Sequence, residues 1–249
     1  MKSTGLYHYT SIDYLLKIVT PFDIDFIATY YKYYKKYDYE WIKDKGESIV
    51  QKICIVNNWK FDPAHLSYDP YIVSFCTNPD SYYMWNEFNG HGSEVMISFN
   101  LDLFLFAIGI VKLECLVPCV YINEKPSDNE IVDAVMQIMS SDFFEDIEQE
   151  DILKLAIMGV MQGQFNQEEE IRYVKLCSRY MTVYPKDEGV LSELYKVPED
   201  KYHIHIQFPI GLINRIVLRN DVSDDDYKDV VKHMVKCGYD PKIIIKQNE

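Results

Sequence analysis

The chain has 249 residues, and 48% of them are hydrophobic, which is enough for a sizeable core in one large domain or two small ones. Its formal net charge of -14 repels phosphate, so general binding to nucleic acid or to an anionic membrane is unfavourable. The six cysteines form no CxxC pair and no close spacing of the kind found in disulfide-rich secreted domains. The chain opens without a hydrophobic signal core and has no apolar stretch of roughly 20 residues, the length that spans a bilayer. We therefore expect a globular cytoplasmic protein with reduced thiols.

The first part of the chain alternates strand and helix signals. Leu6 to Tyr9 form a short predicted strand that leads into a helix, which a capping-box pattern starts near Thr10 and which Pro21 ends. A tyrosine-rich stretch at residues 30–41 predicts an exposed amphipathic helix, because the acidic charge of the chain disfavours the alternative of nucleic-acid stacking. Further signals predict a helix around residues 49–54, a buried strand at 71–76, a short helix at 82–88 and a strand at 94–99.

The second part of the chain predicts the same mixture. Its strand signals lie at residues 113–122, from Glu168 onward, and at 201–208, 213–218 and 241–246, and its helix signals lie at 127–163 and 223–237. Strands scattered through the chain, with helices between them, favour a single α+β domain over residues 1–249. We expect a mixed or antiparallel central sheet with a helical insertion around residues 127–163.

Three charged residues, Glu168, Glu170 and Arg172, occupy alternate positions in the segment QEEEIRYVKLC. In an extended segment they project from one face, while Ile171 and Tyr173 serve the packing. Two carboxylates on one strand face repel each other, and a reacting site that must hold developing positive charge is one reason to keep them. The structural alternative is a solvent-facing ladder on an edge strand.

Several motifs together carry a resemblance to a known family. They are HYT at residues 8–10, D-S-x-x-M-W at 80–85, an aromatic residue followed by E-x-E-x-R at 165–172, and a late INRIVLRNDVSDDDYKDVV segment. In order and spacing they resemble domain-of-unknown-function family 2971, a bacterial family without an established activity. The resemblance covers most of the chain.

A more distant resemblance concerns the ADP-ribosyltransferase fold, which has an HYT-type first strand before a short helix and a late strand with Glu-x-Glu. It implies that NAD is the substrate and that the bond between nicotinamide and ribose breaks with oxocarbenium character. Glu170 would be the carboxylate that stabilises this transition state, and Glu168 would orient or activate the acceptor. His8 would hydrogen-bond the adenosine-side ribose through a neutral imidazole. The acceptor would be a protein, a nucleic acid or water.

The same resemblance implies an aromatic wall beside the reacting carboxylates. Arg172 would pair with the first glutamate of the motif or reach a pyrophosphate oxygen, and the pair is favoured because it lowers the cost of crowding two carboxylates. The chain contains no glycine-rich phosphate loop, so the cofactor must be held by other means. The residues that would offer a flat surface for nicotinamide are Tyr9, Tyr82, Tyr83 or Trp85.

Each feature also has a structural interpretation. A histidine between two tyrosines is more often a satisfied structural residue, and Met84 and Trp85 suit a hydrophobic core. His203 and His205 share a strand face, but no HExxH motif or clustered carboxylate accompanies them, so we expect no metal and rank a metal-dependent hydrolase last. The leading hypothesis is an ADP-ribosyltransferase-like enzyme that cleaves NAD. The alternative is a noncatalytic scaffold domain that binds a partner or a nucleotide.

Overall fold

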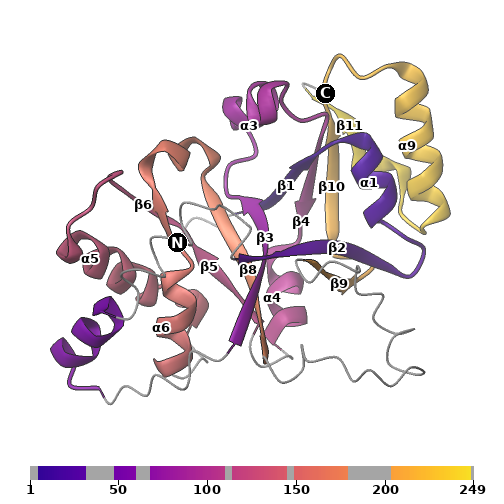
Figure 1. The fold of residues 1–249 in the computed structure, drawn as a ribbon. Helices are drawn as coiled ribbons and strands as arrows, with labels where there is room; N and C mark the ends of the chain where they lie inside the picture. The colour runs from indigo at the N-terminus through magenta and orange to yellow at the C-terminus, as the bar shows by residue number, and fades with distance from the viewer. Residues whose placement is uncertain are drawn as a thin grey trace.

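A computed structural model of the chain describes residues 5–31, 48–59, 68–109, 114–144, 149–178 and 203–247 (Figure 1). The predicted helix at residues 30–41 lies largely outside the described residues. Within them, a mostly antiparallel sheet forms the centre of the molecule, and helices pack around it. The predicted α+β class with a mostly antiparallel central sheet is confirmed. No helix in these ranges is long and apolar enough to cross a membrane.

The central sheet contains nine strands within the described residues. β10 and β11 are parallel neighbours, and the other neighbouring pairs are antiparallel. The strands are β1 (Leu6–Thr10), β2 (Asp23–Tyr30), β3 (Tyr68–Cys76), β4 (Val95–Phe99), β5 (Glu114–Pro118), β8 (Glu170–Ser178), β9 (His203–Pro209), β10 (Ile213–Leu218) and β11 (Ile244–Lys246).

Three strands pair with β3, and together they fork the sheet into two branches. One edge of β3 pairs with β8 along its whole length, and β8 also pairs with β5. The other edge is shared, because β2 pairs with Tyr71 and Ile72 whereas β1 pairs only with Cys76. From this fork one branch continues through β1, β4, β10 and β11, and the other through β2 and β9. Figure 1 shows β2 running across the direction of β3 and β8.

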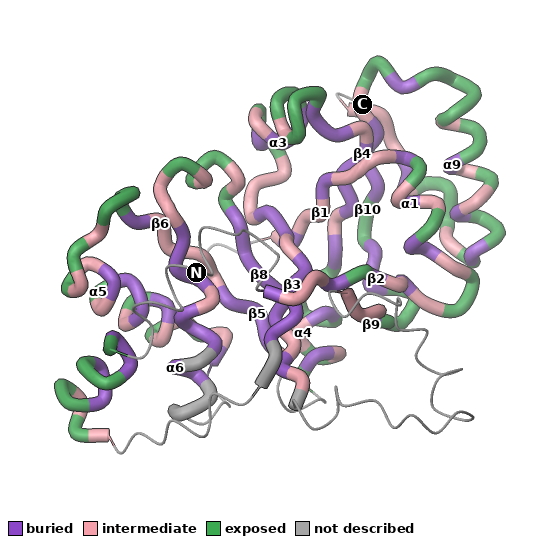
Figure 2. The backbone as a smooth tube through the Cα atoms, viewed as in Figure 1, coloured by how far each residue is buried: buried purple, intermediate pink, exposed green. Residues whose placement is uncertain are grey.

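One face of the sheet is covered by the largest hydrophobic core. Phe75 of β3 and Phe26 of β2 belong to it, so the β2 and β9 branch folds over this face. The helices α1 (Ile12–Ile18), α4 (Leu101–Gly109) and α9 (Asp224–Lys236) contribute apolar side chains to the same core. Figure 2 shows the buried residues concentrated in the central strands, while α9 is exposed along its outer side.

The opposite face carries two smaller clusters. α5 (Asp128–Met139), α6 (Gln149–Ile157) and a helical segment at 48–56 pack on β3, β5 and β8, and we call this the α5–α6 cluster. α3 (Tyr82–Asn86) packs on β1, β3, β4 and β10. This α3 cluster consists of Tyr9, Cys76, Met84, Trp85, Met96 and Val217.

Serine residues begin four of the described helices. Ser11 of α1, Ser127 of α5 and Ser223 of α9 each accept a hydrogen bond from the backbone N–H three residues further on. Ser81 caps α3 in the same way, through the backbone N–H of Met84. The predicted helix starts near residues 11, 81 and 127 are therefore confirmed. The cap at Ser81 fixes where α3 begins and so helps to place its buried side chains on the sheet.

The predicted helical insertion is a β–α–α–β unit. β6 (Val120–Ile122) and β7 (Val160–Gln162) form a separate parallel pair, and α5 and α6 lie between them in the chain. The prediction of helix up to residue 163 is wrong at its end, because the chain leaves α6 and pairs with β6. The 3₁₀ helices η4 (Asp142–Phe144) and η5 (Gly163–Glu168) complete the connection from β5 to β8.

Other elements also differ from the prediction. The single strand expected at residues 113–122 is two strands, β5 and β6, which belong to different sheets. The helix expected at 82–88 ends at Asn86 and is followed by η3 (Phe88–Gly90), and the last strand begins only after η6 (Pro241–Ile243). β2 and α4 are absent from the prediction. The alternation in β2 of the partly exposed Asp23 and Asp25 with the buried Ile24 and Phe26 is the signal that would have found it.

Candidate functional site

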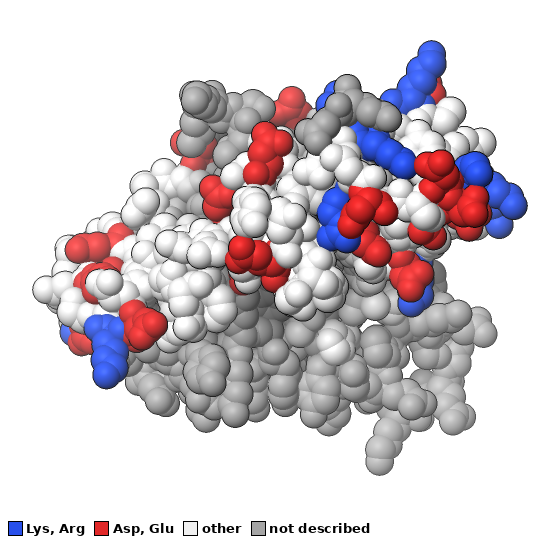
Figure 3. All heavy atoms as spheres, turned by 90° about the horizontal axis from the view of Figure 1, so that it is seen from above, with Lys and Arg blue, Asp and Glu red and all other residues white. Residues whose placement is uncertain are grey.

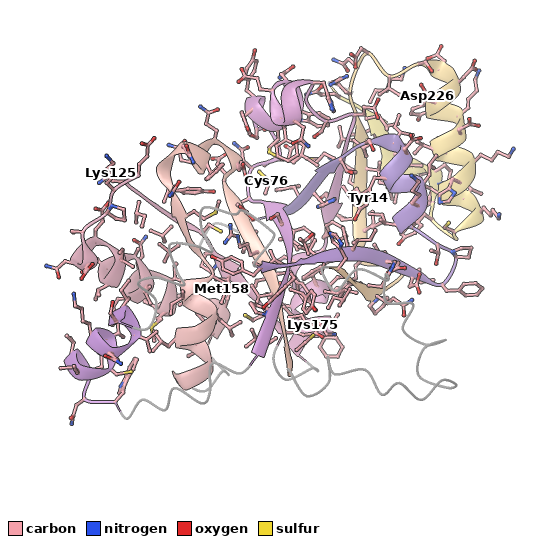
Figure 4. The ribbon with its side chains drawn as sticks, viewed as in Figure 1. Tyr14, Cys76, Lys125, Met158, Lys175 and Asp226 are labelled. Atoms are coloured by element: carbon pink, nitrogen blue, oxygen red, sulfur yellow. The ribbon has the colours of Figure 1, made fainter. Side chains whose placement is uncertain are left out.

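A polar seam lies on the sheet face between the α3 cluster and the α5–α6 cluster. It consists of Ser74 on β3 and Glu170 and Arg172 on β8. Ser74 is in register with Arg172, and Cys76 with Glu170, so all four side chains project from one face. Glu170 is 4% exposed and Arg172 is 0% exposed, and among the described residues they are the two buried charged residues. Figure 4 labels Cys76 on the β3 side of this region and Met158 on the α6 side.

Contacts from three residues hold Glu170. Arg172 Nε donates a hydrogen bond to Glu170 Oε1 at 3.0 Å, and the Ser74 hydroxyl donates to the same oxygen. The backbone N–H of Glu170 donates to the hydroxyl oxygen of Tyr121 at 2.7 Å. The carboxylate is therefore oriented by the protein before any ligand arrives.

Arg172 is enclosed by the protein as well as paired. Its Nη1 donates a hydrogen bond to the carbonyl oxygen of Met158, and its Cζ lies 5.7 Å from the centroid of the Tyr31 ring. Burying two charges is costly unless they are paired and hydrogen-bonded, and both conditions hold here. The sequence favours a pair with Glu168, whereas in the structure the Nε bond of Arg172 goes to Glu170.

Glu168 does not lie on the same strand as Glu170. It is the last residue of η5, and Glu169 follows it with φ 44° and ψ 49°, a left-handed conformation. The prediction that Glu168, Glu170 and Arg172 alternate along one strand is wrong for Glu168, because the left-handed residue breaks the period of two. The edge-ladder interpretation is also wrong, because β8 lies between β3 and β5 and buries Glu170 and Arg172.

Tyr121 lies near both glutamates. Burial raises the pKa of Tyr121, and the nearby charges of Glu170 and Glu168 raise it further. Sequence reasoning missed both Tyr121 and Ser74. A serine within the apolar strand YIVSFC was a usable signal, because a polar residue on a buried face needs a partner. Nothing in the local sequence of β6 distinguished Tyr121.

His8 occupies the fork of the sheet. Its Nδ1 lies 3.0 Å from the backbone carbonyl oxygen of Ser74, on the part of β3 between its β1 and β2 pairings. A carbonyl only accepts, so Nδ1 carries the proton and supplies the partner that a strand would otherwise provide. The imidazole ring packs edge-on against Phe26 and Phe75, with centroids 5.0 and 5.7 Å away.

His8 and Glu170 lie on opposite faces of the sheet and meet at Ser74. His8 binds the Ser74 carbonyl, and Glu170 binds the Ser74 hydroxyl. Burial lowers the pKa of His8 to about 4, so the ring is neutral at pH 7 and Nε2 carries the lone pair. Nε2 makes no hydrogen bond with any residue in the described ranges.

The lowered pKa of the His8 imidazole should make stability depend on pH. In the unfolded chain the ring takes up a proton near pH 6.5, whereas the folded pKa is about 4. Between these values the unfolded state binds more protons, so stability falls as pH falls, by up to about 3 kcal/mol at pH 4. Urea unfolding of wild type and His8→Gln at pH 7 and pH 4 measures this difference. Equal losses in the two proteins would contradict it.

Tyr9 and Trp85 form part of the core beneath α3. Both are buried, and their rings meet edge-on with centroids 5.1 Å apart. The Tyr9 hydroxyl lies 2.6 Å from the carbonyl oxygen of Pro79 and 2.9 Å from that of Asn78. Trp85 Nε1 donates to the Pro79 carbonyl at 3.3 Å. These two residues therefore shape the wall beside the seam and do not offer an exposed stacking surface.

The other two predicted aromatic residues lie on the outside of α3. Tyr82 is 71% exposed, and Tyr83 is partly buried against Phe88, with ring centroids 6.3 Å apart. α3 contacts η5, the segment that ends at Glu168. The structure thus brings the exposed aromatic surface of α3 and Glu168 to neighbouring segments.

Removal of the Ser74 hydroxyl should weaken the hold on Glu170. Ser74→Ala takes away a hydrogen bond to a charged acceptor, and we expect a loss of about 1–2 kcal/mol in the free energy of unfolding. Ser98→Ala is a matched control, because Ser98 is a partly exposed serine on β4 whose side chain makes no hydrogen bond with the described residues. Chemical denaturation gives both values. Equal effects of the two substitutions would argue against a bond between Ser74 and Glu170.

The histidines at 203 and 205 belong to the outer branch of the sheet. His205 Nδ1 lies 2.9 Å from both carboxylate oxygens of Asp25 on β2. Within the ranges that the structure covers, no group of three or more His, Cys, Asp or Glu residues is arranged to hold a metal ion. None of the six cysteines forms a disulfide bond.

Comparison of the chain with known protein families, with characterised proteins and with solved structures found no match. The resemblances to family 2971 and to the ADP-ribosyltransferase fold therefore remain predictions. Support for a function comes from the contacts of Glu170, Arg172, Ser74 and His8.

Proposed function

We propose that this protein is an ADP-ribosyltransferase-like enzyme that cleaves NAD, with Glu170 as the carboxylate that stabilises the reacting ribose. The observation that supports this most strongly is the orientation of Glu170 by Arg172 and Ser74 within a buried seam. An oriented carboxylate in a site with little water stabilises developing positive charge without further rearrangement.

The reaction breaks the bond between C1′ of the ribose and the nicotinamide nitrogen. The bonding electron pair leaves with nicotinamide, and positive charge develops on C1′ and the ring oxygen of the ribose. A hydrogen bond from the adjacent ribose hydroxyl to Glu170 strengthens as this charge grows, so it stabilises the transition state more than the bound substrate. An oxygen or nitrogen of the acceptor, or of water, then bonds to C1′ and releases a proton.

Glu168 suits the role of accepting that proton. It is partly exposed and ends η5, and it lies near Tyr121, whose hydroxyl binds the backbone of Glu170. The two glutamates therefore sit in different environments, one enclosed and paired and the other open to solvent. Pairs of carboxylates with different environments divide acid–base and electrostatic roles in this way.

α3 would bind another part of the substrate. His8 lies on the opposite face of the sheet from Glu170, so it would act indirectly, by holding the backbone of Ser74, whose hydroxyl orients Glu170. The exposed ring of Tyr82, or that of Tyr83 beside it, would provide the flat surface for nicotinamide. Tyr9 and Trp85 would act indirectly, by holding the loop before α3 in place.

Release of nicotinamide from NAD by the purified protein tests the proposal. We expect release under at least one of two conditions. In the first, a cell lysate supplies the acceptor, and in the second, water is the only acceptor. A protein that releases no nicotinamide under both conditions, and whose melting temperature NAD leaves unchanged, is not an enzyme of this class.

One observation favours the noncatalytic alternative. Glu170 and Arg172 are almost completely enclosed, as expected for a buried ion pair that only specifies how β8 packs. In that case the seam would belong to a scaffold domain that binds a partner or a nucleotide. The ligand of such a protein would still raise its melting temperature. Substitution of Glu170 would change the stability of the fold alone.

A further inference from the structure

A single row of residues crosses five neighbouring strands on the sheet face that carries the polar seam. Opposed residues of an antiparallel ladder project to the same side, so these side chains share that face. Four strand spacings separate the Cα atoms at the two ends of the row, which is roughly 19 Å. The row runs from Glu170 of β8 through Cys76 of β3, Tyr7 of β1 and Ser98 of β4 to Arg215 of β10.

An irregularity in β10 puts Arg215 on this face. Ile213 pairs with Phe99, and Arg215 pairs with Ser98, so Asn214 is an extra residue in the ladder. In a regular ladder Arg215 would oppose Ile97 and point into the large core. The bulge moves its side chain to the other face, which is the usual effect of a bulge on the residue next to it.

Arg215 is open to solvent. It is exposed, and its neighbours Tyr7 and Ser98 in the row are partly exposed. It makes no hydrogen bond or ion pair with any residue that the structure describes. Burial raises the pKa of Tyr7, and the positive charge of Arg215 opposes this shift.

Other arginines near the row are already engaged. Arg172 is paired with Glu170, and Arg219 pairs with Asp221 and donates through Nη1 to backbone carbonyls, including that of His91 at 3.1 Å. The surface as a whole is acidic, and Figure 3 shows carboxylates spread over the middle of the face seen from above. An anionic ligand therefore needs a local cation, and Arg215 is available for that purpose.

We propose that Arg215 binds the phosphate groups of the dinucleotide whose ribose lies against Glu170. This inference rests on the proposed function. The chain has no glycine-rich loop to bind the phosphates, and Arg215 is assigned that role. The dinucleotide would lie along the row, over Tyr7, with its uncharged sugar over the seam and its phosphates toward β10. A guanidinium binds two phosphate oxygens at once, which suits a diphosphate better than an ammonium would.

A comparison of NAD with nicotinamide riboside, which carries the same sugar without phosphate, separates the contribution of the phosphates to binding from that of the sugar. We expect Arg215→Gln to raise the Kd for NAD about tenfold or more by isothermal titration calorimetry, with less than a twofold change for nicotinamide riboside. Lys232→Gln makes the same charge change on α9, which packs on the opposite face of the sheet, and it should leave both values unchanged. Because Arg215 is exposed, the melting temperature of Arg215→Gln should equal that of wild type.

Two results would count against the inference, and they differ in whether the proposed function also fails. If wild type binds NAD and Arg215→Gln binds it within twofold, the assignment of Arg215 is wrong while the proposed function stands. If wild type binds neither NAD nor nicotinamide riboside, the proposed function fails and this inference fails with it. Loss of affinity in Arg215→Gln that disappears at high salt would support a phosphate contact.

Discussion

Nicotinamide release from NAD should fall at least about 100-fold when Glu170 is replaced by glutamine. Glutamine keeps the size of the side chain and can still accept hydrogen bonds from Ser74 and Arg172, but it carries no negative charge to stabilise the ribose cation. The same change removes the charge that pairs with the buried guanidinium of Arg172, so we also expect a loss of about 3 kcal/mol in the free energy of unfolding. Steady-state kinetics below the melting transition separates the two effects.

Glu169→Gln is the matched control for this substitution. Glu169 is the neighbouring glutamate, it is exposed, and its carboxylate accepts a hydrogen bond from Asn78 Nδ2 at 2.7 Å. Its replacement should change both activity and stability little, since exposed polar contacts contribute little. If folded Glu170→Gln retains wild-type turnover, Glu170 is a structural residue and the scaffold hypothesis becomes the better one.

Arg172→Met should be the most destabilising of these single substitutions. Methionine fills much of the same space, but it leaves the carboxylate of Glu170 buried without its cation and the Met158 carbonyl without its donor. We expect a loss of about 4 kcal/mol in the free energy of unfolding, measured by chemical denaturation at pH 7. Lys175→Met on the same strand is the control, because its ion pair with Glu114 is partly exposed and should contribute only about 1 kcal/mol.

The double variant Glu170→Gln/Arg172→Met tests whether the two residues act as a pair. With both charges of the pair removed, neither is left buried without the other, and stability should return to within about 2 kcal/mol of wild type. Such a variant would be folded and inactive, which removes misfolding as an explanation for lost turnover. Additive losses would show that the two residues do not depend on each other for stability.

The sequence predicted the elements whose signals are local. Serine caps, the strand at residues 71–76 and the amphipathic helix after Ser223 were all visible, because capping and hydrophobic periodicity are properties of neighbouring residues. α4 was not predicted, since its run of leucine and phenylalanine is apolar on all sides and shows little periodicity. The division between β5 and β6 was also hidden, because which sheet a strand joins depends on distant partners.

The candidate site was found in part for the same reason. Glu170 and Arg172 were visible as charges in an apolar segment, and their pairing on one face follows from strand alternation. The separation of Glu168 depends on a left-handed residue at Glu169, which is uncommon for glutamate and leaves little trace in the sequence. Tyr121 could not be found, because it reaches the start of β8 only through the pairing of the preceding strand β5 with β8, which are distant in the sequence.

The fork at β3 has a consequence for synthesis of the protein. β3 ends at Cys76, but β8, which pairs with one edge of β3 along its whole length, begins only at Glu170. β4 pairs with β10, which begins only at residue 213. While the ribosome adds residues 77–169, an apolar strand with unpaired backbone groups stays available to other nascent chains. The protein should therefore depend on chaperones that shield early strands, and slowing translation after β8 should favour folding more than slowing it before.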